Sequence, residues 1–352
     1  MIDTDSKLAS LLEALDTAPW IAVDTEADSM HSHPEKLCLL QISIPGQDDL
    51  VDTLADFDRQ PLWDLLKPRE LLLHGADYDL RLFCKHHAFI PDRLFDTMIA
   101  ARLLGRTQFG LAHLVKEYLN IELEKGPQKS DWSKRPLTPR MEEYARNDTR
   151  HLQPLVELLR GELEAKGRSG WQEESCQRLI TDNTRNEAPD PDRVWRIKFS
   201  TKLSRPALAL LREIWKWRET EAIRTNRPPY YILRHESLIA IAEAGSEGDP
   251  FEKLIPHRYS QRRRRALIEA VKRGQDCPPD QQPKPLRNRG YHATEKEKAA
   301  CIALRAKRDK VATALQIDPT LLASKDTLEQ LTRKDNEAAW QGLIKWQREL
   351  LS

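Results

Sequence analysis

Short apolar runs alternate with amphipathic stretches through the first half of the chain. Apolar segments of strand length are predicted at residues 20–23, 37–44, 49–51 and 71–74, and helical spacing of apolar positions at residues 76–87, 96–104 and 111–119. Pro45-Gly46-Gln47 predicts a hairpin turn between two of these strands. A longer helix is predicted after Pro139, with apolar residues at three- and four-residue steps. This alternation is typical of an α/β domain.

The second half of the chain has helical periodicity and two polar, proline-containing interruptions. The expected organisation is a first domain over residues 1–168, a linker over 169–203, a helical domain over 204–276, a linker over 277–292 and a second helical domain over 293–352. The second linker contains the run Pro278 to Pro285, which favours extended, polyproline-like chain.

The two helical segments resemble each other at an ungapped offset of 90 residues. The offset superposes Arg218 on Arg308, Ala222 on Ala312, Pro229 on Pro319 and Leu238 on Leu328. A duplicated small helical bundle is the economical interpretation. Chance similarity between two amphipathic helix pairs is the alternative.

Charge is unevenly distributed along the 352 residues, although the net charge is only +1. Residues 1–170 contain 21 Lys and Arg against 29 Asp and Glu, a net of −8, and residues 171–352 carry a net of +9. Such a division fits an acidic, cation-binding site in one half and a surface for a polyanion in the other. Two ordinary solvated domains with uneven charge would give the same numbers.

Cysteine usage and hydropathy narrow the class of protein. The five cysteines are an odd number without a C-x-x-C pair, which excludes a disulfide framework and a cysteine zinc site. No apolar run approaches the ~18 residues of a membrane helix, and the acidic amino terminus lacks the features of a secretory signal. We therefore expect a cytoplasmic protein, a monomer, with no membrane partner.

Four acidic residues occupy positions where acids are unusual. Asp24 and Glu26 end an apolar strand at i and i+2, so both side chains leave on one face. Asp79 lies on the helix after another strand, and Asp148 lies one helical turn after Tyr144. Carboxylates brought together from these elements would repel each other unless cations neutralised them. Hard carboxylate oxygens suit Mg²⁺ or Mn²⁺.

Two such ions about 3.5–4 Å apart form the usual clamp for in-line attack on a phosphodiester. One ion makes hydroxide from water and the other stabilises the leaving 3′ oxygen. Tyr144 would orient, or even deprotonate, the attacking water. Taken singly, a D-x-E pair often occurs by chance, and a Y-x-x-x-D pair is usually a core aromatic beside a solvated acid. The combination, in this order and on these elements, is specific.

Four stretches resemble the DEDD family of 3′→5′ exonucleases, tyrosine subclass, and within it the ribonuclease D family. They are VDTEADSMHSHPEKLCLLQIS, LLLHGADYDLRLF, FDTMIAARLLG and SDWSKRPLTPRMEEYARNDTRHL, and the resemblance extends over nearly all of residues 18–160. The resemblance implies a ribonuclease-H-like α/β fold with a mixed central sheet. It further implies that Asp24 bridges two metal ions, that Glu26 and Asp148 hold the water-activating ion, that Asp79 supports the other ion, and that Tyr144 positions the nucleophile.

The second half resembles the HRDC domain in the stretch LALLREIWKWRETEAIRTNRPPYYILRHESLIAIA, with a shorter, divergent copy around KRDKVATALQIDPTLLASKDTLEQL. Two small all-α HRDC-like domains are therefore expected after the exonuclease domain. The implied activity is release of 5′-mononucleotides from RNA 3′ ends, with tRNA precursors and other small structured RNAs as substrates. A DNA-directed exonuclease and a non-catalytic nucleic-acid-binding scaffold are the alternatives.

Several further residues are candidates for substrate contact. The resemblance implies that the segment after the D-x-E pair supplies a wedge against the last base, so Met30 and Gln41 are candidates for contact with the terminal nucleotide. Met30 is otherwise an ordinary loop or core residue. His74 would approach the scissile phosphate or terminal ribose, or else is a hydrogen-bonded core histidine.

Basic and aromatic residues add weaker candidates. Trp132 would stack on a base or hold its loop against the sheet. Lys134 and Arg135 would meet phosphates or simply be solvated. Four consecutive arginines, Arg262, Arg263, Arg264 and Arg265, are candidates for RNA-backbone contact. Because four consecutive helical residues point in all directions, at least one must meet core, partner or carboxylate.

Overall fold

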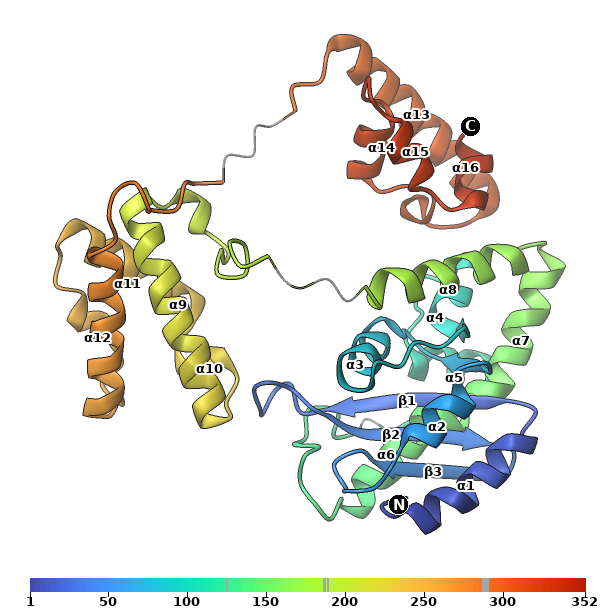
Figure 1. The fold of residues 1–352 in the computed structure, drawn as a ribbon. Coiled ribbons are helices and arrows are strands. Elements are labelled where there is room, and N and C mark those ends of the chain that lie inside the picture. The colour runs from blue at the N-terminus through green and yellow to red at the C-terminus, as the bar shows by residue number, and fades with distance from the viewer. Residues whose placement is uncertain (125, 186–187, 189, 287–290) are drawn as a thin grey trace. The chain divides into compact units, whose positions relative to one another are not determined.

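The first half of the chain is built on a five-stranded mixed sheet. The structure is a computed structural model and describes residues 1–124, 126–185, 188, 190–286 and 291–352. The strands are β1 (Ile21–Ala27), β2 (Leu37–Ile44), β3 (Gln47–Asp52), β4 (Glu70–Leu73) and β5 (Arg93–Asp96), in the order β3-β2-β1-β4-β5. β1 pairs antiparallel with β2 (Figure 1) and parallel with β4. The expected mixed α/β sheet is confirmed.

Helices cover both faces of this sheet. They are α1 (Asp5–Thr17), α2 (Gln60–Leu66), α3 (Asp77–His87), α4 (Thr97–Leu103), α5 (Leu111–Leu119), α6 (Pro139–Arg150), α7 (Leu152–Ala165) and α8 (Ser169–Asn183). On one face, Val23, Leu40 and Leu71 pack with buried residues of α1, α2 and α3. On the other, Leu39 packs with residues of α6, and Ala22 belongs to the core that includes α7. Alternate residues of each strand therefore serve two separate cores.

The predicted elements of this half are confirmed, with two corrections, and three further elements were not predicted. Those three are β5, α1 and α2, and the long helix after Pro139 is divided at His151 into α6 and α7. The expected linker over residues 169–203 is wrong at its start, because residues 169–183 form α8. Cys176 and Ile180 of α8 are buried in the core beneath the sheet.

The second half is helical, as predicted. Its elements are η1 (Ser200–Lys202), α9 (Arg205–Thr225), α10 (Pro229–Ile232), α11 (His235–Glu247), η2 (Phe251–Leu254), α12 (Gln261–Gln275), α13 (Glu295–Leu315), η3 (Pro319–Leu321), α14 (Lys325–Leu331), α15 (Glu337–Gln341) and α16 (Lys345–Leu351). The chain forms two compact units: residues 1–27, 37–186 and 291–352, and residues 28–36 and 187–290. We call these unit 1 and unit 2.

The two helical segments share boundaries at the offset of 90 residues. Helices α9 and α13 each have 21 residues and begin at Arg205 and Glu295. Arg218 donates to the carbonyl oxygen of Leu233, and Arg308 makes the same contact with Ala323. The offset found in the sequence therefore has a counterpart in helix length and in a buried side-chain contact.

The last segment, residues 291–352, packs within unit 1 rather than standing apart. Arg168 donates to the carbonyl oxygen of Leu315 at 2.6 Å. Trp171 of α8 stacks on Trp346 of α16 with ring centroids 4.9 Å apart. Helix α8 is thus a platform for the final helices, which is why it is ordered where a linker was expected.

The structure also bears on membrane-spanning helices and on the state of the cysteines. Across the described ranges, every helix is too short or too polar to traverse a bilayer. All five cysteines are free thiols.

Candidate active site

Strand β1 presents Asp24 and Glu26 on the face of the sheet that α6 covers. Asp24 pairs with Gln41 of β2, and Glu26 pairs with Leu39, which packs with residues of α6. Thr25 points to the opposite face, where its hydroxyl donates to the carboxylate of Asp79 on α3. Asp79 is therefore held at the end of β1 by the residue between the two acids.

Helix α6 supplies the remaining two predicted residues. It begins at Pro139, and the Thr138 hydroxyl accepts a hydrogen bond from the amide of Met141, which caps the first turn. Tyr144 and Asp148 lie one turn apart, and the phenol of Tyr144 hydrogen-bonds to the carboxylate of Asp148. The tyrosine is thus oriented by one of the acids.

Burial raises the pKa of all four carboxyl groups, and charges within the cluster add to this for three of them. Burial, followed by the charges of Asp79, Asp148 and Glu26, holds the pKa of Asp24 well above its usual range. Burial and the charge of Asp148 raise the pKa of Glu26 to about 9. Burial raises the pKa of Asp79 to about 6, and burial with the charge of Asp79 raises that of Asp148 to about 7. Like charges near a buried carboxyl group disfavour its ionised form.

The donor set fits a hard divalent cation in its chemistry. All four groups offer carboxylate oxygens, and their mutual repulsion favours bound positive charge. Within the described ranges, however, no three His, Cys, Asp or Glu side chains are disposed to close around a single ion. Residues of the right type are therefore assembled, and side-chain rotation would be needed to complete coordination by Asp24, Glu26, Asp79 and Asp148.

The cation-free protein should lose stability as pH rises. A carboxyl group whose folded pKa exceeds its unfolded value of about 4 stabilises the fold only while protonated. Its contribution is full below that unfolded value and is lost as pH rises through the folded values of about 6, 7 and 9. Urea unfolding in EDTA should show stability falling from pH 6 to pH 9, and Glu26→Gln should flatten that fall. An equal fall in the variant would contradict the assignment.

Tyr144 lies beside a cavity and against a glycine. The cavity has a volume of about 860 Å³ and is lined by Tyr144, Asp148, His113 and Ser130 among others. Its size is in the range of small-ligand sites. A Cβ atom built on Gly126 would lie 1.6 Å from the ring of Tyr144, so the backbone at Gly126 rests directly on that ring. Burial, together with the charge of Asp148, raises the pKa of Tyr144, which favours an orienting role over deprotonation of water in the cation-free site.

Trp132 and Arg135, two predicted substrate-contact residues, are engaged within the domain. Trp132 is 0% exposed and packs in a core with Leu39, its ring centroid 6.1 Å from that of Tyr144. Arg135 makes a two-bond ion pair with Asp52, at 2.6 and 2.7 Å, and also donates to the carbonyl oxygen of Cys38. Both side chains fasten their loop to the sheet, which favours the packing role, and their contact with RNA stays a prediction.

The other predicted contact residues fall into different environments. Gln41 is 0% exposed, and its contact with a terminal nucleotide stays a prediction. His74 hydrogen-bonds to Thr97 at 2.8 Å, as a core histidine would, and burial lowers its pKa. Met30 is 45% exposed, and its carbonyl oxygen accepts from Tyr230 within unit 2. Lys134 is exposed, at 4.0 Å from Asp131.

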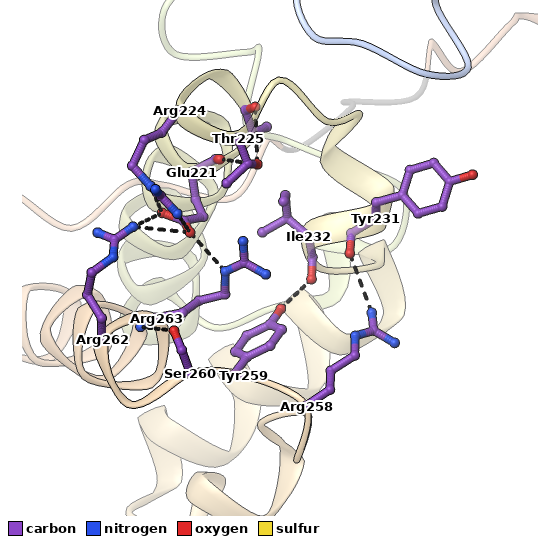
Figure 2. Close-up of polar contacts among 11 residues, drawn as sticks. Glu221, Arg224, Thr225, Tyr231, Ile232, Arg258, Tyr259, Ser260, Arg262 and Arg263 are labelled. Carbon is purple, nitrogen blue, oxygen red and sulfur yellow. Dashed lines mark hydrogen bonds and ion pairs between the residues drawn. The ribbon is translucent and has the colours of Figure 1, made fainter. Parts of the chain in front are cut away.

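The four consecutive arginines of α12 have unequal partners (Figure 2). Arg262 and Arg263 both bind the carboxylate of Glu221, at 3.0 and 2.8 Å, where Arg224 also binds. Hydrogen bonds from Arg224 and then from Arg263 lower the pKa of Glu221 to about 2. Arg264 donates to the carbonyl oxygen of Glu252 at 2.9 Å, and Arg265 is exposed. Arg263 and Arg264 are therefore engaged inside unit 2.

Thr25, Gly126 and Glu221 have roles that sequence reasoning did not identify. The orientation of Thr25 could have been predicted from the sequence, because a residue between two acids on a strand faces the opposite side of the sheet. The roles of Gly126 and Glu221 could not, because they depend on contacts with Tyr144 and with three arginines far away in the sequence.

Comparison with known proteins agrees with this geometry. Residues 1–164 match a family model described as 3′-5′ exonuclease, and residues 207–247 match the HRDC domain. Ribonuclease D of Zymomonas mobilis is 37% identical over 69% of this chain and 63% of its own length. Ribonuclease D of Escherichia coli (strain K12) is 31% identical over 94% of this chain and 89% of its own length.

A solved structure extends the similarity to three dimensions. The crystal structure of Escherichia coli RNase D, described as an exoribonuclease involved in structured RNA processing, has a TM-score of 0.77 and 28% sequence identity. The superposition covers 100% of this chain and 96% of that one. Since the exonuclease model and the HRDC model both match, and the similarity to a ribonuclease D extends over nearly the full length, the chain belongs to the ribonuclease D family of 3′→5′ exoribonucleases.

Proposed function

We propose that this exoribonuclease acts in the cytoplasm on tRNA precursors and other small structured RNAs, and that it depends on two divalent cations, Mg²⁺ or Mn²⁺. The observation that carries the proposal is the set of four mutually interacting carboxylates, Asp24, Glu26, Asp79 and Asp148, joined by Tyr144. Relatives named ribonuclease D, one of them described as acting in structured RNA processing, support the substrate class. Five free cysteines fit a reducing compartment.

The chain's own residues have separable tasks in this proposal. When bound, the two cations supply the Lewis acidity that activates water and stabilises the leaving 3′ oxygen. Asp24, Glu26, Asp79 and Asp148 hold them. The Tyr144 phenol, fixed by Asp148, orients the attacking water. The cavity beside Tyr144 has room for the terminal nucleotide.

A labelled-RNA assay tests the proposal. RNA labelled at its 5′ end should shorten one nucleotide at a time in Mg²⁺ or Mn²⁺, while RNA labelled at its 3′ end should release labelled 5′-mononucleotide at once. EDTA should stop both. Equal hydrolysis in EDTA would contradict the cation requirement, and faster cleavage of matched DNA would favour a DNA-directed enzyme. Binding without cleavage would favour a scaffold.

Gly126→Ala should slow hydrolysis without unfolding the protein. The added methyl group would lie 1.6 Å from the Tyr144 ring, so the ring must move from its place beside Asp148. A misplaced orienting group can cost up to about 100-fold in rate. Turnover on a short RNA should fall at unchanged RNA affinity. Gly161→Ala is the matched control, because its Cβ would meet nothing within 4 Å. Equal activity in the two variants would contradict the role of Gly126.

Unit 2 carries the surface that we propose for the body of the RNA. It consists of Arg224, Arg262, Arg258 and Tyr231, and we call it the arginine–tyrosine surface. The side chains of Arg224 and Arg262 are 50% and 57% exposed although both bind Glu221. Three guanidinium groups on one carboxylate leave an excess of positive charge held in place. Tyr231 is 50% exposed, and Figure 2 shows its ring pointing away from the cluster.

Salt dependence separates the two kinds of contact on the arginine–tyrosine surface. Arg262→Gln should reduce the slope of log K against log salt by about 1, because one phosphate contact is lost. Tyr231→Ala should weaken binding by about 1–3 kcal/mol at every salt concentration, since stacking releases no counterions. Fluorescence anisotropy with a tRNA-sized RNA measures both.

The control for this surface is Arg273→Gln. Arg273 lies on the same helix, is 54% exposed and is also ion-paired, to Glu213 at 3.7 Å. It should leave the slope unchanged. The same loss of slope in Arg262→Gln and Arg273→Gln would mean that general charge, and not this surface, binds RNA.

A further inference from the structure

Gln41 is a fully buried amide beside the acidic cluster. Its side chain is 0% exposed, and neither its Nε2 nor its Oε1 atom has a hydrogen-bond partner in the described part of the chain. An amide buried without hydrogen bonds costs free energy, and an apolar side chain of similar size would avoid that cost. Such groups are few in native proteins, so each one needs an explanation.

The position of Gln41 along β2 shows what lies above it. Leu39 and Ser43 are its neighbours on the same face of the strand. Leu39 packs with Ala145 of α6, and the Ser43 hydroxyl lies 2.7 Å from that of Thr149, also on α6. Gln41 therefore lies beneath the stretch of α6 between these two contacts, which is the stretch that carries Asp148.

Gln41 has one apolar and one acidic cross-strand neighbour. Its partner on β3 is Leu50, which is apolar and buried, and its partner on β1 is Asp24. Side chains of directly paired residues lie on the same face with Cβ atoms about 4.5–5.5 Å apart. The polar group that Gln41 can reach across the sheet is thus a carboxylate of the acidic cluster.

We propose that Gln41 is a positioning residue for the divalent-cation site. Its amide nitrogen donates to the Asp24 carboxylate when that carboxylate holds a cation, and its amide oxygen accepts from a water molecule of the loaded site. The role rests on the cation dependence proposed above. Hydrogen bonds from outside the ligand set orient ligating side chains and commonly change metal affinity by about 10- to 100-fold.

The experiment compares Mn²⁺ binding by the wild-type protein, Gln41→Leu and Ser43→Ala, using isothermal titration calorimetry in the absence of RNA. Gln41→Leu removes both polar atoms at similar volume. Ser43→Ala is the control, because Ser43 lies two residues away on the same face and already has a partner. Urea unfolding in EDTA gives the stability of each cation-free protein, and Gln41→Met replaces Gln41→Leu if the latter does not fold.

Gln41→Leu should weaken Mn²⁺ binding by about 10- to 100-fold while the cation-free protein is at least as stable as wild type. Ser43→Ala should bind Mn²⁺ within about two-fold of wild type, since it lies outside the proposed contact. Unchanged Mn²⁺ affinity in Gln41→Leu would overturn the role and leave the proposed function standing, with Gln41 reduced to a buried, water-satisfied side chain. A wild-type protein that bound no Mn²⁺ would overturn both.

Discussion

Asp24→Asn is expected to abolish RNA hydrolysis while leaving RNA binding intact. Asp24 is buried, and the charges of the other three carboxylates all act on it, so it is the member of the cluster best placed to hold the proposed cations. Cations contribute several kcal/mol of transition-state stabilisation, and each ~1.4 kcal/mol corresponds to tenfold in rate. Single-turnover hydrolysis of a 3′-overhang RNA in Mn²⁺ should fall at least about 10³-fold. Anisotropy should report unchanged affinity, because the arginine–tyrosine surface is untouched.

Asp77→Asn is the matched control for this experiment. Asp77 lies two residues before Asp79 on the same helix, but its side chain is 56% exposed and paired with Arg81. It should retain full activity. Asp148→Ala should behave like Asp24→Asn and should in addition remove the acceptor of the Tyr144 phenol. Wild-type turnover in Asp24→Asn would exclude the carboxylate cluster as the catalytic centre.

Trp132→Ala is expected to be the most destabilising single substitution discussed here. The side chain is 0% exposed and fills the core between β2 and α6, with Leu39 and Met141 as neighbours. Truncation of a buried tryptophan to alanine costs about 3–5 kcal/mol, because it removes buried apolar surface and leaves a cavity. Urea unfolding should show this loss. Activity at a permissive temperature should also fall, since the Tyr144 ring loses its aromatic neighbour.

Trp132→Phe separates packing from stacking on RNA. Phenylalanine keeps an aromatic face, so a base-stacking role would be largely preserved, whereas the larger core site would still be underfilled. We expect an intermediate loss of stability with little change in KM. If Trp132→Ala instead raised KM for RNA at unchanged stability, the residue would be a substrate contact. Its packing between β2 and α6 would then contribute nothing to the stability of the fold.

Local pattern was sufficient for most of the α/β framework. The hairpin of β2 and β3, the helix α3 after β4 and the shared face of Asp24 and Glu26 follow from periods of two and 3.6 residues, which depend only on neighbours in sequence. The D-x-E pair and the Y-x-x-x-D pair could be placed on their elements for the same reason. Helix α8 was missed because its apolar residues are few and its order depends on what packs against it.

The environments of polar side chains were predicted less well from the sequence, because their partners lie far away along the chain. Arg135 is charged and sits in a loop, yet its partner Asp52 is 83 residues away and draws it inward. Gln41 looks like a ligand contact in sequence and is closed off by α6 in the fold. Arg262 and Arg263 are adjacent in sequence and equal in charge, and Glu221 on another helix engages both.

The sequence by itself determined most strands and helices of the α/β framework and which face of each element carries the acids, because strand and helix periods act over a few residues. It also carried the four carboxylates and the tyrosine on which the proposed cation chemistry rests. Only the tertiary structure decided which of the remaining polar and aromatic residues face solvent. Whether such a residue is exposed or buried depends on contacts between segments tens to hundreds of residues apart, as Trp132, Arg135 and Gln41 show.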